Sequence, residues 1–187
     1  MKIKFLTTGG TIDKVYFDAK SEFQVGSPQV LEILREANID FEFEVWHYRL
    51  WEIELSPDPS KDEEELRQIV ANFERVSMPR HLPFAWRLLA RHYRLAGRLD
   101  AADQALASGF QIAEKLKNPE YAWPLHAESA ELAVARGDIR GAQSQLRRAV
   151  QVLRDLSLHF PTQENQDLFL ARRDRAAVLQ RLRELSA

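Results

Sequence analysis

The sequence contains no cysteine, which excludes a disulfide framework, a thiolate metal site and a cysteine nucleophile. Long apolar runs are also missing. No stretch approaches the roughly 18 apolar residues of a membrane span, and the first four residues lead into a strand-like run without a signal-peptide pattern. The net charge of −2 gives no overall attraction to nucleic acid or to an anionic membrane. We therefore expect a cytoplasmic protein that binds neither.

The 187 residues have an ordinary globular composition, with 45% hydrophobic and 29% charged residues, so the chain suits one domain or two small ones. The composition changes along the chain. Residues 1–45 hold four lysines and one arginine, whereas residues 46–187 hold three lysines and eighteen arginines. The apolar alternation also slips by one residue at Val45–Trp46, which predicts a bulge or a change of element there. Both features place a boundary at this point.

Residues 1–45 read as strand, glycine turn, helix and strand. Lys2 to Thr7 is rich in β-formers, and two glycines follow it. Ser27 and Pro28 are a helix cap and a first-turn proline, which predicts a helix that ends near Asn38. A second alternating run then extends to Val45. The segment is predicted to be a small β-α-β appendage.

The stretch "TTGGTIDK" at residues 7–14, followed by "SEFQVG", resembles the N-terminal segment of bacterial L-asparaginases. In that family a T-G-G-T-I turn after the first strand carries the nucleophile. The resemblance implies that Thr11 is the nucleophile and that Gly9 and Gly10 lie against the substrate. The family also has a flap tyrosine before a Val-Gly pair. This chain has Phe23 there, with Tyr16 nearby as the substitute.

The second half of that catalytic machinery is missing from the sequence. A threonine hydroxyl needs a base, and the family supplies it from an H-G-T-D-T stretch and a later lysine. No such stretch exists here. Losing members of a catalytic constellation costs orders of magnitude in rate. An L-asparaginase-type amidohydrolase is therefore the alternative function, and binding is the favoured one.

Residues 46–79 are predicted to be a linker and a first helix. The linker ends in the turn residues 56–60, and Ser60 with Glu63 forms a capping box before the helical run "KDEEELRQIVANFERV". The five histidines are scattered, and none stands at a metal-ligand spacing from another. We expect no metal site and no cofactor.

From residue 80 onward the chain repeats itself with a period of 40 residues, the spacing between positions 97 and 137. Aligning 97–116 with 137–156 matches five pairs: Gly97 with Gly137, Ala102 with Ala142, Leu106 with Leu146, Gln111 with Gln151 and Leu116 with Leu156. A glycine between two apolar-periodic segments predicts a tight turn between paired helices. Such repetition is typical of arrays in which neighbouring hairpins bury each other's apolar faces.

The first copy resembles the tetratricopeptide repeat. The positions that carry the resemblance are Trp86, Leu89, Ala90, Tyr93, Gly97, Ala102 and Leu106, with Gly109 where the motif usually has alanine. The second copy lacks the Trp and the Tyr. The resemblance implies a mainly α fold, an antiparallel helical-hairpin array over 80–187 with a C-terminal capping helix. It also implies a module that binds a peptide or partner protein in a helical groove.

Three arginines mark the predicted groove. The apolar stripe of this helix, which consists of Trp86, Leu89, Ala90 and Tyr93, is expected to face the paired helix. Arg87, Arg91 and Arg94 then share an adjacent face. Arginine suits bidentate carboxylate recognition, so this face is predicted to bind an acidic peptide or carboxyl terminus. The alternative is a solvated charged face compensated by Glu131. A further interpretation of the whole chain is a chimera or gene fusion, whose N-terminal piece has no selected function.

Overall fold

The computed structural model describes residues 3–7, 14–17, 22–25, 36, 43–47, 62–75 and 79–186. The chain divides into two compact units, Met1–Pro57 and Asp58–Ala187. The predicted boundary at residue 45 lies inside the first unit. Each unit is described by itself below.

The described part of the first unit consists of two strand pairs: β1 (Ile3–Thr7) runs parallel to β4 (Phe43–His47), and β2 (Lys14–Phe17) is antiparallel to β3 (Glu22–Val25). Parallel strands require a crossover connection. The helix predicted to supply it lies outside the described residues except for Glu36, which is helical. The β-α-β unit as a whole therefore stays a prediction. The β2–β3 hairpin was not predicted.

The bulge predicted at Val45–Trp46 was wrong. Strand β4 continues across this dipeptide in unbroken register, with Val45 opposite Phe5 and Trp46 opposite Leu6. A slip in the apolar alternation predicts a bulge only if the strand has one apolar face. Strands of parallel pairs are commonly covered on both faces and then carry apolar residues in both phases.

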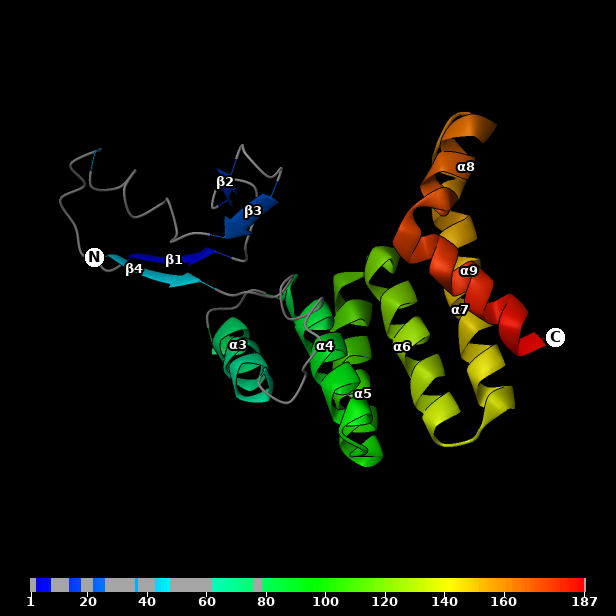
Figure 1. Ribbon diagram of the computed structural model, residues 1–187, viewed down its shortest axis with the longest axis horizontal. Coiled ribbons are helices and arrows are strands. Elements are labelled where there is room, and N and C mark those ends of the chain that lie inside the picture. Colours follow the sequence, from blue (N-terminus) through cyan, green and yellow to red (C-terminus); the bar gives the residue numbers. More distant parts are fainter. Residues whose placement is uncertain are drawn as a thin grey trace. The chain divides into compact units, whose positions relative to one another are not determined.

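The second unit is helical throughout its described residues, as the repeat pattern predicted (Figure 1). Its elements are α3 (Glu63–Arg75), α4 (Leu82–Leu95), α5 (Leu99–Leu116), the short 3₁₀ helix η3 (Pro119–Tyr121), α6 (Ala122–Ala135), α7 (Ile139–Ser157), α8 (Gln163–Ala171) and α9 (Arg173–Ser186). Successive helices from α4 to α7 pack as antiparallel neighbours, and α4 also contacts α6.

The hairpins α4–α5 and α6–α7 begin and turn at equivalent positions of the repeat. Their first helices span 82–95 and 122–135, and their second helices begin at 99 and 139. Gly97 and Gly137 close the two turns with φ angles of 75° and 77°, a conformation that side chains with a Cβ disfavour. The turns predicted from these glycines are confirmed.

Small residues set the spacing between the helices. Ala102 and the equivalent Ala142 are fully buried. Gly109 of α5 lies so close to α6 that an added Cβ would stand 2.8 Å from Cδ2 of Leu125, which is itself buried. The glycine at this position therefore has a packing reason, because the hairpins could not approach this closely around an alanine without moving Leu125.

Polar contacts fix the two ends of the helical unit. On α3, Glu63 accepts hydrogen bonds from Arg98, and its Oε2 lies 3.0 Å from Nε2 of the buried His92. At the other end α9 packs on α7, burying Val178, and Arg181 pairs with Glu131 of α6 at 2.9 Å. Ser60 of the predicted capping box lies outside the described residues.

Candidate functional site

The residues implied by the asparaginase resemblance fall in the first unit. Thr11, Gly9 and Gly10 lie outside the described residues. Tyr16 is in β2, where its backbone pairs with that of Phe23 in β3. The proposed substitute for the flap tyrosine is thus the cross-strand neighbour of the residue it would replace.

The predicted arginine face lies on α4, where the helix contacts α6. The side chain of Arg94 is 16% exposed, and its Nε donates to Oε1 of Glu128 at 2.7 Å. Glu128 is 8% exposed, so this ion pair is largely withdrawn from water. The expected compensation by Glu131 is wrong, because Glu131 pairs with Arg181 of α9 instead.

Glu128 is the electrostatic centre of this cluster. Burial raises the pKa of its carboxyl group, and three positive charges oppose the effect: Arg94 through its hydrogen bond and charge, and Arg87 and Arg91 through their charges. A buried carboxylate is costly unless it is paired and hydrogen-bonded. Of the three arginines predicted from the sequence, Arg94 therefore binds this carboxylate directly, and Arg87 and Arg91 act on it through their charges. We call Arg87, Arg91, Arg94 and Glu128 the arginine cluster.

The neighbours of the cluster show how α4 divides its faces. Leu89, Ala90 and Tyr93 are buried as predicted, while Trp86 is only partly buried. Arg87 and Arg91 are partly exposed, and the guanidinium of Arg87 lies 4.8 Å from the ring centroid of Phe84. Part of each of these two side chains therefore remains accessible to solvent.

Glu128 was not predicted, although the repeat period points to it. Position 128 is the equivalent of position 88, and Leu88 is 2% exposed. Because the first copy has a buried leucine at the equivalent position, a glutamate here indicates a buried charge that needs a partner. The arginines of α4 are that partner.

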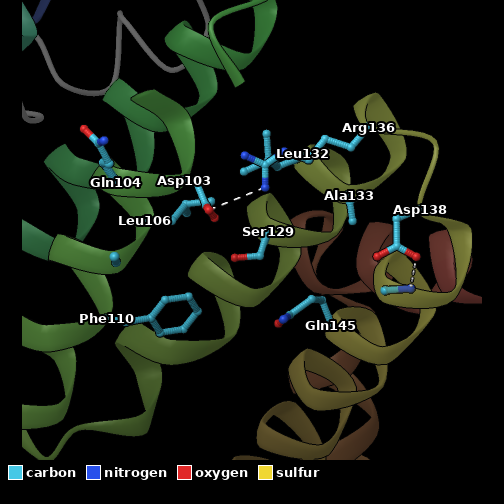
Figure 2. Close-up of a pocket in the computed structure, with 12 residues that line it drawn as sticks. Asp103, Gln104, Leu106, Phe110, Ser129, Leu132, Ala133, Arg136, Asp138 and Gln145 are labelled. Atoms are coloured by element: carbon cyan, nitrogen blue, oxygen red, sulfur yellow. Dashed lines mark hydrogen bonds and ion pairs between the residues drawn. The ribbon is translucent and has the colours of Figure 1, made fainter. Parts of the chain in front are cut away.

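A second feature is a cleft of about 460 Å³ among α5, α6 and α7 (Figure 2). Its lining residues are Asp103, Gln104, Leu106, Ala107, Phe110, Ser129, Leu132, Ala133, Arg136, Asp138, Gly141 and Gln145. Figure 2 shows Phe110 of α5 and Gln145 of α7 on opposite sides, with Ser129 of α6 between them. No sequence motif pointed to this cleft, because its residues come from three helices.

The side of the cleft near Gln145 is held by His126. Nδ1 of His126 lies 2.8 Å from Oε1 of Gln145, and the His126 ring packs on Phe110 with 4.7 Å between centroids. Burial lowers the pKa of His126, with the hydrogen bond to Gln145 opposing and the charge of Arg148 adding to the effect. Because the ordinary value is about 6.5, the ring is neutral at pH 7.

Within the part of the chain that the structure describes, no three histidine or carboxylate side chains gather as a metal site would require. None of the described helices is long and apolar enough to cross a membrane. Comparisons with protein-family models, with curated proteins and with solved structures give no significant match. The case for a function thus rests on the residues themselves.

Proposed function

We propose that the chain is a protein-interaction module of tetratricopeptide-like type, which binds an acidic peptide or the carboxyl terminus of a partner protein across α4 and α6. The observation that carries the proposal is the arginine cluster, in which Arg94 pairs with the buried carboxylate of Glu128 and the charges of Arg87 and Arg91 on the same helix also act on it. This face already binds one carboxylate of the chain itself, because Oε1 of Glu128 accepts a hydrogen bond from Arg94.

The arrangement of the helices supports this proposal. The hairpins α4–α5 and α6–α7 begin at equivalent positions of the repeat, and the first helices of the two hairpins contact each other. In arrays of stacked hairpins the first helices form one continuous surface, on which a partner is bound. In the tetratricopeptide motif, which the first hairpin resembles, this surface is the peptide groove.

The chemistry of arginine also supports an anionic partner. Each guanidinium presents several donors in a planar fork that matches a carboxylate, and three of them in two helical turns repel one another unless carboxylates lie among them. Glu128 uses Oε1 to accept from Arg94. A second carboxylate, from a partner, would contact the exposed surface of Arg87 and Arg91, in addition to the interactions that these side chains already make within the chain.

The proposal is tested with the full chain and two fluorescein-labelled peptides. One alternates glutamate and glycine over eight residues and has a free carboxyl terminus, and the other has glutamine at each glutamate and an amidated end. Fluorescence anisotropy should show binding of the acidic peptide alone, weakening as salt rises from about 50 to about 500 mM, because the screening length falls over this range.

The matched variants are Arg91→Glu in the cluster and Arg183→Glu on an exposed face of α9. Reversing Arg91 replaces an attraction by a repulsion, so we expect at least a tenfold loss of affinity. Arg183→Glu should bind as the parent does. Equal binding of the acidic and neutral peptides, or equal losses in the two variants, would overturn the proposal.

A further inference from the structure

The cleft among α5, α6 and α7 has the size and the lining of a ligand site. At about 460 Å³ it is within the usual range for small ligand pockets, which is roughly 300 to 1,000 Å³. It joins the two hairpins, since α5 belongs to the first and α6 and α7 to the second. Such junctions between packed units are common places for binding.

One part of the lining is apolar. Leu106 and Leu132 are each 3% exposed, so they form a closed floor, and the partly buried ring of Phe110 forms a wall. The exposed Ala107 lies at the edge of this apolar part and leaves it open. An apolar side chain that enters here buries its own surface and that of the Phe110 ring. Each Å² of apolar surface removed from water contributes about 25 cal/mol of favourable free energy.

A second part of the lining consists of neutral hydrogen-bonding groups, supplied by Gln104, Ser129 and Gln145. Gln145 is held in place because its Oε1 bonds to His126 Nδ1, and its amide nitrogen is then the group that can donate to a bound carbonyl. Amide and hydroxyl side chains are suited to the N–H and C=O groups of an extended peptide. A preordered side chain also loses little entropy on binding.

The charges around the cleft favour a cation. Arg136 is already shared between Asp100 at 3.1 Å and Asp103 at 3.4 Å, and it also donates to the carbonyl of Leu99. The carboxylate of Asp138 caps α7 by accepting from the amide of Gly141 at 2.8 Å. Of these groups, Asp103, Asp138 and Arg136 line the cleft, so the lining carries two negative charges and one positive charge and its net charge is negative.

We infer that this cleft binds an extended peptide segment through one apolar side chain, with a lysine or arginine next to it in the peptide sequence. The apolar residue lies over Leu106, Leu132 and Phe110, the peptide backbone bonds to Gln145 and its polar neighbours, and the basic residue lies near the carboxylates of the lining. This ligand has the opposite charge to the one proposed for the arginine cluster, so binding at the two sites can be told apart.

The test uses the full chain labelled with ¹⁵N and three capped peptides, acetyl-Gly-Leu-Lys-Gly-amide and its relatives with Ser for Leu or Glu for Lys. Binding by such short peptides is weak, on the order of 1 mM, which nuclear magnetic resonance titration measures well. The Leu-Lys peptide should give saturable shifts at the amides of Ser129, Gly141 and Gln145. The other two peptides should bind at least threefold more weakly.

Ala107→Trp is the blocking variant, because it places an indole in the open edge of the cleft without touching the closed floor. Ala177→Trp, at an exposed position of α9, is the matched control. Ala107→Trp should lose binding at least tenfold, and the control and Arg91→Glu should retain it. If Ala107→Trp does not fold, Gln104→Trp takes its place.

Three results would overturn the inference: no saturable shift at the three amides, equal affinity for the Lys and Glu peptides, or parent-like binding by a folded blocking variant. Retention by Arg91→Glu separates this test from that of the arginine cluster. Failure of either site leaves the other standing.

Discussion

Removing the carboxylate of Glu63 should weaken the packing of helix α3 on the α4–α5 hairpin. Glu63 pairs with Arg98 beyond the end of α4 and with Arg67 on its own helix, and its Oε2 lies 3.0 Å from Nε2 of His92. His92 is 3% exposed, and its Nδ1 is buried without a hydrogen-bond partner among the described residues. The Glu63→Ala variant leaves both ring nitrogens of His92 unpartnered.

The size of the effect follows from these contacts. An orphaned buried polar group costs about 1–3 kcal/mol. The side chain of Arg98 is 42% exposed, so its ion pair, screened by solvent, adds little to this cost. We expect the free energy for opening α3 to fall by about 2 kcal/mol. Glu64→Ala is the control, because Glu64 is in the same helical turn but bonds only to the exposed Gln68 in the described residues.

The effect should depend on pH. The hydrogen bond from Arg98, aided by that of His92 and by the charge of Arg67, lowers the pKa of Glu63 from 4.5 to about 2. A carboxyl group whose pKa is lower in the folded state stabilises that state fully above about pH 4.5 and loses its effect as the pH falls toward 2. The difference between parent and Glu63→Ala should therefore be smaller at pH 3 than at pH 7.

Amide hydrogen exchange of residues 66–73, followed by nuclear magnetic resonance, measures the opening of α3 directly. Stability of the whole chain is a poorer readout, since it mixes two units. Equal exchange in Glu63→Ala and Glu64→Ala would refute the reasoning. So would a difference between parent and Glu63→Ala that stayed the same at pH 3.

Two further perturbations test the repeat and the alternative function. Gly97→Ala and Gly137→Ala should each destabilise the helical unit by about 1–2 kcal/mol in urea titrations. The two losses of stability should be equal, because both glycines have nearly the same positive φ and no atom lies within 4 Å of an added Cβ. Unequal losses would contradict the equivalence of the two turns. Asparagine hydrolysis by the full chain, followed as ammonia release, should not exceed that of a Thr11→Ala control, because the second catalytic constellation is missing. Turnover that disappears in Thr11→Ala would establish the amidohydrolase instead.

Much of the helical fold was predictable because its determinants are local. The repeat period, the glycines at 97 and 137, and the apolar stripe of α4 predicted two hairpins, and the structure has them. Gly109 was visible only as a departure from the motif. A glycine is needed at this position because Leu125 of the next hairpin lies close to it, and this tertiary contact is not encoded in any local pattern.

The candidate sites were predictable only in part. The spacing of Arg87, Arg91 and Arg94 placed three charges on one helix face, but the choice of partner depends on how α6 is rotated against α4. That rotation places Glu128 next to Arg94, whereas Glu131 pairs with Arg181. The cleft is harder still, since its lining residues on α5, α6 and α7 are far apart in sequence and share no motif.

We propose above that the face of α4 and α6 binds acidic peptides. Hydrogen exchange of the full chain, measured by mass spectrometry with and without the saturating Glu-Gly peptide, tests it most directly. If the peptide lies across α4 and α6, exchange should slow in residues 82–95 and 122–135 and stay unchanged in α8 and α9. Unchanged exchange in both segments under conditions where the peptide is bound would contradict it.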